Sequence, residues 1–288
     1  MLYLDAENTR RALPMADAVD AMAHAFSGEA ETPLRTMVGV SLVMPGRLDD
    51  HMAVKVVSSV PGNPAGIVVV FGPDGSPVGI VDGPTLTAIR TGAVCGLATR
   101  LLAPDGVSTL AALGAGAMGL DQIEAIRAVR PLERILVWSR DLEKAKALAG
   151  RVGGEAVADP DAAVAEADVV SCATPARSPL FRPESVRPGA HLNAVGAFTP
   201  EMAELPPEVL HEAFVVVDDR DAAAAEAGDL LQAGRTPDAT LRELLEGSAT
   251  PPAGRTTVFK SVGVAAQDVA AGQRALENAA RMGLGIRL

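Results

Sequence analysis

The sequence has few cysteines and no long hydrophobic run. Cys95 and Cys172 are the only two cysteines among 288 residues, and each lies in an apolar stretch. They are expected to be buried free thiols in a reducing compartment, because neither has the setting of a disulfide. The N-terminal segment lacks the apolar core of a signal peptide, and no stretch approaches the ~20 apolar residues of a membrane span. We therefore expect a soluble, cytoplasmic protein.

Basic clusters and sets of metal ligands are also missing. The formal net charge is -11, and lysines and arginines do not gather in any one segment. This distribution argues against a nucleic-acid partner. The four histidines are scattered and have no ligand spacing with the cysteines, so no metal is expected. With 48% hydrophobic residues, the chain is long enough for two ordinary domains without disulfides or metals.

The strongest motif is a glycine-rich segment, GAGAMG, which starts at Gly114 and ends at Gly119. Residues 107–113 form an apolar run of strand length before it, and residues 120–129 carry apolar side chains at helical spacing after it. In this strand–turn–helix context, G-x-G-x-x-G predicts a dinucleotide site. Gly114 permits the tight turn, Gly116 lets a pyrophosphate approach the backbone, and Gly119 lets the helix pack on the strand. The helix N-terminus then offers unpaired N–H groups to the phosphates.

The N-terminal third is predicted to form a helix followed by sequential strands. Asp5 is expected to cap a first turn, and Pro14 to begin a helix that runs to about Phe26. Strand-like segments follow at residues 36–43, 52–57, 67–71 and 78–81. Turn signals are found at residues 45–46, 61–64 and 72–75. Short turns between strands favour an antiparallel or mixed sheet, and residues 85–102 then predict a long apolar helix.

From residue 107 the pattern changes to alternating strands and helices. Strands are expected at residues 134–138, 155–157, 168–173, 191–195, 214–217 and 256–260. Helices are expected at residues 142–149, 161–166, 222–227, 241–245 and 264–282. This alternation predicts a parallel sheet with helices on both faces. The fold class is therefore α/β, with a Rossmann dinucleotide-binding domain at 104–260 and an α+β domain formed by 1–103 with 261–288.

The end of the second Rossmann strand predicts the phosphate preference of the cofactor. An acidic residue there binds the ribose 2′-hydroxyl of NAD, whereas arginine or small polar groups accommodate the 2′-phosphate of NADP. Ser139 stands in that place, followed by Arg140, and Lys144 lies one helical turn on. These groups can hold a phosphate by hydrogen bonding and charge; the alternative is that they begin a solvated loop. Asp141 is expected to cap the next helix. NADPH is preferred on this basis, with NADH as the alternative.

Two cations fall inside apolar segments. Arg90 lies in the predicted helix 85–102, and Lys55 alternates with apolar residues in the predicted strand 52–57. Buried cations rarely persist without a partner, and an anionic substrate carboxylate would be such a partner. The alternatives are an internal ion pair, or a long side chain that reaches water.

The chain resembles the ornithine cyclodeaminase/mu-crystallin family over nearly its whole length. The matching segments are MAVKVV around Lys55, VDGPTLTAIRTGA at 81–93, the glycine-rich segment, AVGAFTPEMAEL at 194–205 and RTTVFKSVGVAAQD at 255–268. TAIRTGA and VFKSVG are the most specific of these. The family includes NAD-recycling ornithine cyclodeaminases, alanine dehydrogenases and NAD(P)H-dependent reductases of cyclic ketimines.

The resemblance implies a homodimer whose first domain carries the dimer interface and much of the substrate pocket. It also implies that the last helix returns to that domain. By motif, the family's carboxylate-binding residues correspond to Arg35, Lys55 and Arg90. The residues expected at the cofactor are Thr91, Gly114, Gly116, Ala117, Met118, Gly119, Ser139, Arg140, Lys144, Thr174 and Val195.

One departure from the family pattern bears on the activity. Ornithine cyclodeaminases carry an aspartate in the loop that follows the strand at 191–195, and Phe198 takes that place here. Phenylalanine cannot transfer a proton, but it offers a face to an apolar or cyclic substrate. Glu201 and Glu204 lie nearby but are shifted in register. Release of ammonia from ornithine is therefore not expected, and imine reduction is.

These features predict an NADPH-dependent reductase of a small cyclic imino acid of the pyrroline- or piperideine-2-carboxylate type. Lys55 and Arg90 are the expected catalytic residues, and Lys55 is the candidate proton donor, because a cationic neighbour such as Arg90 lowers its pKa. Arg35, Lys55, Arg90 and Phe198 are expected to bind the substrate. One alternative is an NAD-dependent ornithine cyclodeaminase or alanine-type dehydrogenase. Another is a mu-crystallin-like binding protein, in which NADPH and a small, aromatic ligand are held without essential turnover.

Overall fold

The computed structural model describes residues 1–58, 60 and 65–288. The chain divides into two compact units. Unit 1 comprises Met1–Ala93 with Gly263–Leu288, and unit 2 comprises Val94–Val262. The first boundary falls within helix α3 (Gly83–Leu102), whereas the sequence placed it at the end of that helix. The turn expected at 61–64 lies outside the described residues. Within those residues, no helix has the length and apolar character needed to cross a membrane.

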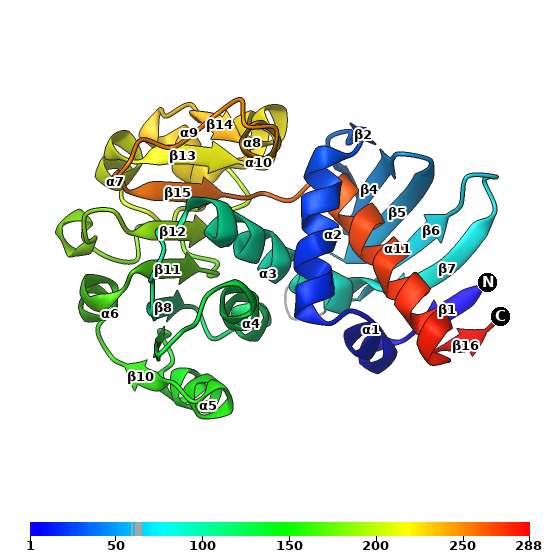
Figure 1. Cartoon of the computed structure of the whole chain (residues 1–288), viewed down its shortest axis with the longest axis horizontal. Coiled ribbons are helices and arrows are strands. Elements are labelled where there is room, and N and C mark those ends of the chain that lie inside the picture. The colour runs from blue at the N-terminus through cyan, green and yellow to red at the C-terminus, as the bar shows by residue number, and fades with distance from the viewer. Residues whose placement is uncertain (59, 61–64) are drawn as a thin grey trace. The chain divides into compact units, whose positions relative to one another are not determined.

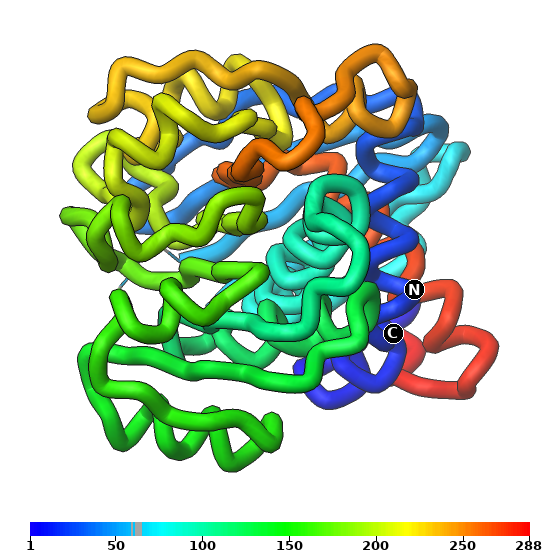
Figure 2. Tube along the Cα trace, turned by 60° about the vertical axis from the view of Figure 1, so that its left-hand side comes forward, coloured from blue at the N-terminus to red at the C-terminus, as the bar shows by residue number. Residues whose placement is uncertain are grey.

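Unit 1 is built on a mixed sheet with the strand order β16–β1–β7–β6–β5–β4–β2, and β3 also pairs with β4. Its strands are β1 (Leu2–Leu4), β2 (Ala30–Glu31), β3 (Thr36–Val38), β4 (Ser41–Leu48), β5 (His51–Ser58), β6 (Gly66–Phe71), β7 (Pro77–Asp82) and β16 (Ile286–Arg287). The β1–β7 pair is parallel, and the central pairs from β4 to β7 are antiparallel. Because β1 also pairs with β16, the two chain ends lie side by side (Figure 2).

Helices cover one face of this sheet. They are α1 (Ala6–Ala12), α2 (Met15–Ser27) and α11 (Ala265–Met282). Figure 1 shows α2 and α11 side by side across the strands, and α11 contacts β4, β5 and β6. The Asp5 carboxylate accepts the N–H of Asn8, which confirms the expected cap. The position of α11 confirms that the last helix packs on the first domain.

The sequence-based prediction was wrong at two turns of unit 1. Residues 36–43 form two strands instead of one, because Gly39 adopts a left-handed conformation with φ of 60° and reverses the chain. Residues 45–46 do not form a turn and lie within β4. Along one edge of β4, β3 pairs with the residues before Pro45 and β2 pairs with the residues after Gly46. In the described sheet, this edge of β4 is therefore unpaired at Pro45, which has no N–H to donate. Gly46 is required because a Cβ there would lie 2.6 Å from the Cβ of Ala265.

Unit 2 contains a parallel sheet with the order β10–β9–β8–β11–β12–β15–β13–β14. Its strands are β8 (Thr109–Leu113), β9 (Arg134–Trp138), β10 (Glu155–Val157), β11 (Val169–Cys172), β12 (His191–Ala194), β13 (Phe214–Val217), β14 (Ala239–Thr240) and β15 (Thr257–Lys260). Its helices are α4 (Gly119–Val129), α5 (Leu142–Val152), α6 (Pro160–Glu166), the 3-10 turn η1 (Pro183–Ser185), α7 (Pro207–Glu212), α8 (Arg220–Glu226), α9 (Gly228–Ala233) and α10 (Leu241–Leu245). Unit 2 is a Rossmann domain, which confirms the predicted fold class. The sequence-based prediction missed α7 and α9.

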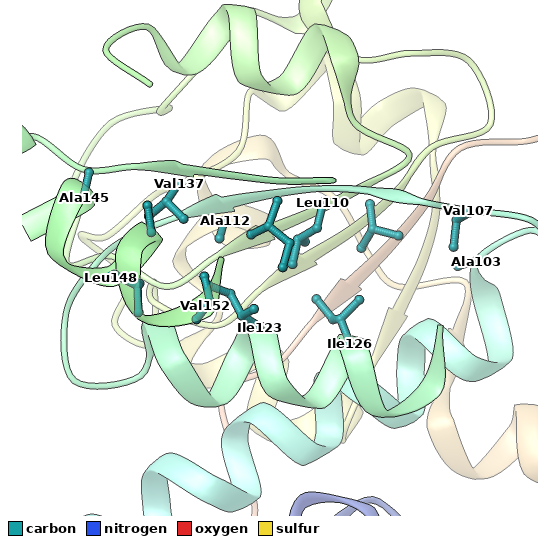
Figure 3. Close-up of a cluster of buried hydrophobic side chains, with 13 residues drawn as sticks. Ala103, Val107, Leu110, Ala112, Ile123, Ile126, Val137, Ala145, Leu148 and Val152 are labelled. Carbon is teal, nitrogen blue, oxygen red and sulfur yellow. The ribbon is translucent and has the colours of Figure 1, made fainter. Parts of the chain in front are cut away.

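The core of unit 2 fixes the helix that follows the glycine-rich segment. Ile123 and Ile126 of α4 point toward the strands and join a buried cluster with Leu110 and Val137 (Figure 3). Leu148 of α5 completes the cluster from the neighbouring helix. The apolar face of α4 therefore sets where its N-terminus lies at the carboxyl end of β8.

Cys95 and Cys172 are free and fully buried in unit 2, as expected. Burial raises the pKa of both thiols, because the charged thiolate is disfavoured away from water. Both therefore remain neutral apolar groups of the core.

Candidate functional site

The glycine-rich segment has the shape of a phosphate-binding turn. Gly114 has φ of 125°, and a Cβ there would lie 2.5 Å from the carbonyl oxygen of Ala173. A Cβ on Gly119, the first residue of α4, would lie 2.5 Å from the carbonyl oxygen of Gly114. Gly116 has no heavy atom within 4 Å of its Cβ position. The turn is thus tight at its two ends and open in the middle, where a pyrophosphate would approach the backbone.

A cavity of about 630 Å³ adjoins this turn in unit 2. The predicted cofactor residues that line it are Gly114, Gly116, Ser139, Arg140, Lys144 and Thr174. Ala117, Met118, Gly119 and Val195 do not belong to its lining in the described part of the chain. Arg177 also lines it, so three cationic side chains surround the cavity. Asp141 is a lining residue too, but its Oδ1 accepts the N–H groups of Glu143 and Lys144 as the cap of α5.

Lys55 of β5 forms a buried ion pair in unit 1. Its Nζ donates to Oδ2 of Asp268 on α11 at 2.6 Å, and the two side chains are 2% and 1% exposed. Asp268 also faces Arg90 of α3, whose Nε lies 3.3 Å from Oδ1. The internal partner of both cations is therefore Asp268. Of the alternatives left open by the sequence, the structure contains the internal ion pair.

The neighbours of Asp268 extend this cluster. Arg90 Nη1 donates to Oε1 of Gln267 at 2.8 Å, and Arg35 Nη2 donates to the carbonyl oxygen of Gly263 at 2.9 Å. Gly263 has φ of 83°, and a Cβ there would lie 2.7 Å from Arg90 Nη1. The glycine thus permits close approach of the guanidinium to the turn that leads into α11.

The environment of Lys55 lowers its pKa to about 8 from an ordinary value of 10.5. Burial is the main cause, because it disfavours the charged ammonium, and Arg90 and Arg35 lower the pKa further. Asp268 opposes them by attraction and by its hydrogen bond. The sequence predicted the lowered pKa through Arg90, but desolvation is the larger effect. A lysine with this pKa can gain or lose a proton near neutral pH.

The loop after β12 places Phe198 at its surface, with 48% of the residue exposed. Glu201 is exposed as well. Glu204 is fully buried, and both of its carboxylate oxygens accept backbone N–H groups. The carboxylate of Glu204 is thus engaged with the backbone of two loops.

Comparison with known proteins identifies the family. The model of the ornithine cyclodeaminase/mu-crystallin family matches residues 5–282, which is almost the whole chain. The chain belongs to the ornithine cyclodeaminase/mu-crystallin family. This confirms the resemblance that the sequence motifs indicated.

Individual members of the family are similar along most of their length. The ketimine reductase mu-crystallin of Mus musculus is 35% identical over 262 residues, which cover 85% of this chain and 84% of that protein. A Delta(1)-pyrroline-2-carboxylate reductase of Bacillus cereus is 34% identical and covers 100% of this chain and 99% of its own. The structure of Thermococcus litoralis Delta(1)-pyrroline-2-carboxylate reductase, in complex with NADH and L-proline, has a TM-score of 0.93. It is 30% identical, and the match covers 100% of both chains.

Sequence reasoning missed three polar residues in this family member. Asp268 and Gln267 lie in the segment 255–268, which carries part of the resemblance to the family. Two adjacent polar residues in an otherwise alanine-rich helix were the signal that could have indicated them. Arg177 lacked a local signal. Among the predicted residues, Lys55, Arg90 and Arg35 come together in unit 1, where Thr91 is also buried in α3.

Proposed function

We propose that this family member is an NADPH-dependent reductase of a small cyclic 2-imino acid, of the pyrroline- or piperideine-2-carboxylate type. The observation that carries the proposal is the buried cluster in which Lys55 and Arg90 share Asp268. A lysine with a pKa of about 8 next to fixed guanidinium groups suits a reaction that binds an acid and moves one proton.

Charge in unit 1 supports an anionic substrate. Among the described residues of the cluster, Lys55 and Arg90 face the carboxylate of Asp268, and the charge of Arg35 acts on Lys55. The Lys55 ammonium and the Arg90 guanidinium share the single carboxylate of Asp268, and a substrate carboxylate would supply a second anion. Arg90 and Arg35 would hold that carboxylate, and the fork of a guanidinium fixes its orientation.

The proposed reaction adds a hydride to the imine carbon and a proton to the nitrogen, which gives a cyclic secondary amine. A bound nicotinamide dinucleotide supplies the hydride. Lys55 holds the proton at Nζ and delivers it to the imine nitrogen, directly or through water. The resulting iminium carbon is electron-poor and accepts a hydride readily. Asp268 holds the Lys55 ammonium in place during binding, and Arg90 orients the substrate.

The cations around the cavity of unit 2 support NADPH. Arg140, Lys144 and Arg177 line it together with Ser139; Oδ1 of Asp141 caps α5, and its Oδ2 lies 3.9 Å from Lys144 Nζ. A 2′-phosphate gains charge-assisted hydrogen bonds from such groups, whereas the 2′-hydroxyl of NADH does not. Phe198 is proposed to offer its ring to the substrate, and Thr91 and Val195 to contact the cofactor.

The named relatives support the reaction class. Two are called reductases of a ketimine or of pyrroline-2-carboxylate, and L-proline in the Thermococcus litoralis complex is the amine expected from pyrroline-2-carboxylate. That complex contains NADH, so the test compares both cofactors. The full-length protein is mixed with pyrroline-2-carboxylate, and the absorbance of the reduced nicotinamide is followed with NADPH or NADH. Faster oxidation of NADPH supports the proposal, whereas turnover with NADH alone removes its cofactor assignment.

Two further assays separate the alternatives. Release of ammonia from ornithine with catalytic NAD would replace the reductase with a cyclodeaminase. Binding of NADPH and a cyclic imino acid without oxidation would replace it with a binding protein. The engaged carboxylate of Glu204 and the ring at Phe198 favour the reductase over the cyclodeaminase.

The protein is also proposed to form a homodimer through unit 1. On β5, Ala53 and Lys55 are buried, whereas the alternate residues Met52 and Val56 are exposed. Val56 pairs with Ile67 of β6, which is exposed too. Apolar side chains thus gather on the sheet face opposite α11, and such patches mark protein interfaces. A second copy of the chain, related by a two-fold axis, would cover this face.

A further inference from the structure

Two loops of unit 2 are tied together at the carboxyl edge of the parallel sheet. β11 and β12 are neighbours in register, with Cys172 opposite Ala194. The loops that follow them begin at the same level and contain Thr174 and Gly196. Ligands of open parallel sheets bind beyond the carboxyl ends of the strands, and Thr174 lines the cavity beside the glycine turn. The geometry of these loops therefore bears on any ligand bound there.

The side chain of Glu204 joins the two loops. Its Oε1 accepts the backbone N–H of Thr174 at 2.6 Å and the Thr174 hydroxyl at 2.9 Å. Its Oε2 accepts the backbone N–H of Gly196 at 2.7 Å. A Cβ on Gly196 would lie 2.6 Å from Glu204 Oε1 and 2.0 Å from the carbonyl oxygen of Thr174. No side chain fits at position 196 without a shift of the Thr174 backbone and of Glu204.

A buried ion pair holds Glu204 in turn. Asp229 Oδ1 accepts the backbone N–H groups of Glu204 and Leu205 at 2.6 and 2.9 Å. Its Oδ2 lies 2.8 Å from Nζ of Lys260 at the end of β15, and both side chains are inaccessible to water. Burial raises the pKa of Glu204 above its usual range, and the charge of Lys260 opposes this rise. Glu204, Asp229 and Lys260 thus form a buried cluster next to the two loops, and none of the three lines the cavity.

We propose that Glu204 is a positioning residue for the dinucleotide, acting through Thr174 and Gly196 without touching the cofactor itself. The inference rests on the proposed dinucleotide site of unit 2. A carboxylate that accepts N–H groups from two loops fixes both backbones at once, and buried hydrogen bonds of this kind are costly to break. Because both loops are already fixed, the cofactor binds to a preformed site, and little conformational entropy of the chain is lost on binding.

The test compares Glu204→Gln with a control variant, Asp168→Asn, at the amino ends of the strands of the same sheet. The amide introduced by Glu204→Gln keeps one acceptor oxygen but turns an NH2 group toward one of the N–H donors. Asp168 Oδ2 accepts the backbone N–H groups of Ser108 and Thr109, both at 3.0 Å, at the amino end of β8. Asp168→Asn therefore neutralises a carboxylate that also binds two backbone N–H groups, but at the amino ends of the strands, and its NH2 group replaces the Oδ1 atom that pairs with Arg187 at 2.8 Å. The Kd of NADPH is measured for each full-length protein from the nicotinamide fluorescence.

Glu204→Gln is expected to raise the Kd and the KM of NADPH about tenfold or more, because an NH2 group facing an N–H donor breaks a buried hydrogen bond. The KM of the imino acid, which unit 1 is proposed to bind, should stay within about twofold. Asp168→Asn should leave the Kd of NADPH nearly unchanged even if its melting temperature falls equally. If Glu204→Gln does not fold, Glu204→Asp serves instead, because it keeps the charge but is too short to reach both loops.

An unchanged Kd in a folded Glu204 variant would overturn the inference, and so would an equal rise in Asp168→Asn. Failure of the unmodified protein to bind either NADPH or NADH would instead overturn the proposed function. The two failures are therefore distinguishable in one set of titrations.

Discussion

Lys55 Nζ lies 2.6 Å from Asp268 Oδ2, although 213 residues separate the two in the sequence. Both side chains are almost completely withdrawn from water. A buried ammonium without a partner is unfavourable, and the carboxylate offsets that cost. Asp268 therefore influences both the protonation of Lys55 and the stability of unit 1.

Asp268→Asn is expected to lower the pKa of Lys55 further, because burial and the two arginines would act without the opposing carboxylate. The alkaline limb of the kcat/KM profile should move to lower pH. The free energy of unfolding should fall by about 3–5 kcal/mol, since breaking a buried pair leaves its partner uncompensated. Denaturant unfolding and the pH profile measure the two effects. Glu277→Gln, on the exposed side of the same helix, is the control, and an unmoved limb would contradict the prediction.

The pH dependence of the unmodified enzyme follows from Lys55. Its pKa of about 8 means that the proton is present below this pH and lost above it. For imine reduction, kcat/KM should therefore fall as pH rises through about 8. Lys55→Met keeps much of the bulk but has no proton, so this limb should disappear and kcat should fall by ~10²- to 10⁴-fold.

Arg90→Ala is the comparison for Lys55→Met. It removes carboxylate binding and should raise the KM of the imino acid more than it lowers kcat. If Lys55→Met also changes mainly KM, Lys55 binds the carboxylate and another group donates the proton.

Arg140→Ala should raise the KM of NADPH and leave that of NADH almost unchanged. A charge-assisted contact of ~1.5–3 kcal/mol corresponds to roughly a 10- to 150-fold loss. Steady-state kinetics with both cofactors provide the measurement. Arg151→Ala is a suitable control, because this exposed arginine of α5 does not line the cavity. Equal use of NADPH and NADH by the unmodified enzyme would refute the preference.

Ornithine should release no ammonia even at saturating NAD, because Phe198 cannot transfer a proton and Glu204 is engaged with two loops. An assay of free ammonia over hours, with an ornithine cyclodeaminase as the positive control, tests this. Phe198→Asp should not create efficient release, since the surrounding loop differs as well. Robust release by the unmodified protein would mean that Glu201 or another group supplies the missing acid.

The proposed homodimer should dissociate when a charge is placed on the exposed sheet face of unit 1. Val56→Asp would bury a carboxylate in the proposed interface, which is unfavourable without a partner. Sedimentation at micromolar concentration should show a dimer for the unmodified protein and a monomer for this variant. Leu142→Asp, at an exposed apolar residue of unit 2, should remain a dimer. A monomeric unmodified protein would exclude the proposed assembly.

Local sequence patterns predicted much of the fold. The apolar run before Gly114 and the helical spacing after Gly119 are properties of neighbouring residues, and they place β8 and α4 correctly. The alternation of strands and helices from residue 107 predicted the parallel sheet for the same reason. Prediction was wrong at Pro45 and Gly46, where turn-forming residues lie within a strand. The strand conformation there is decided by the unpaired edge of β4 at Pro45 and by the close packing of Ala265 on Gly46. Both depend on residues that lie outside this segment of the sequence.

The sequence by itself determined that Lys55 and Arg90 are cations in apolar elements, and that GAGAMG follows a strand and opens a helix. Only the tertiary structure decided that Asp268 faces both cations and that Glu204 is buried and hydrogen-bonded to two loops. The physical reason is that burial and pairing depend on elements brought together from distant parts of the chain. Desolvation of Lys55, which is the main cause of its lowered pKa, arises in the same way, because it requires the packing of α11 against the sheet.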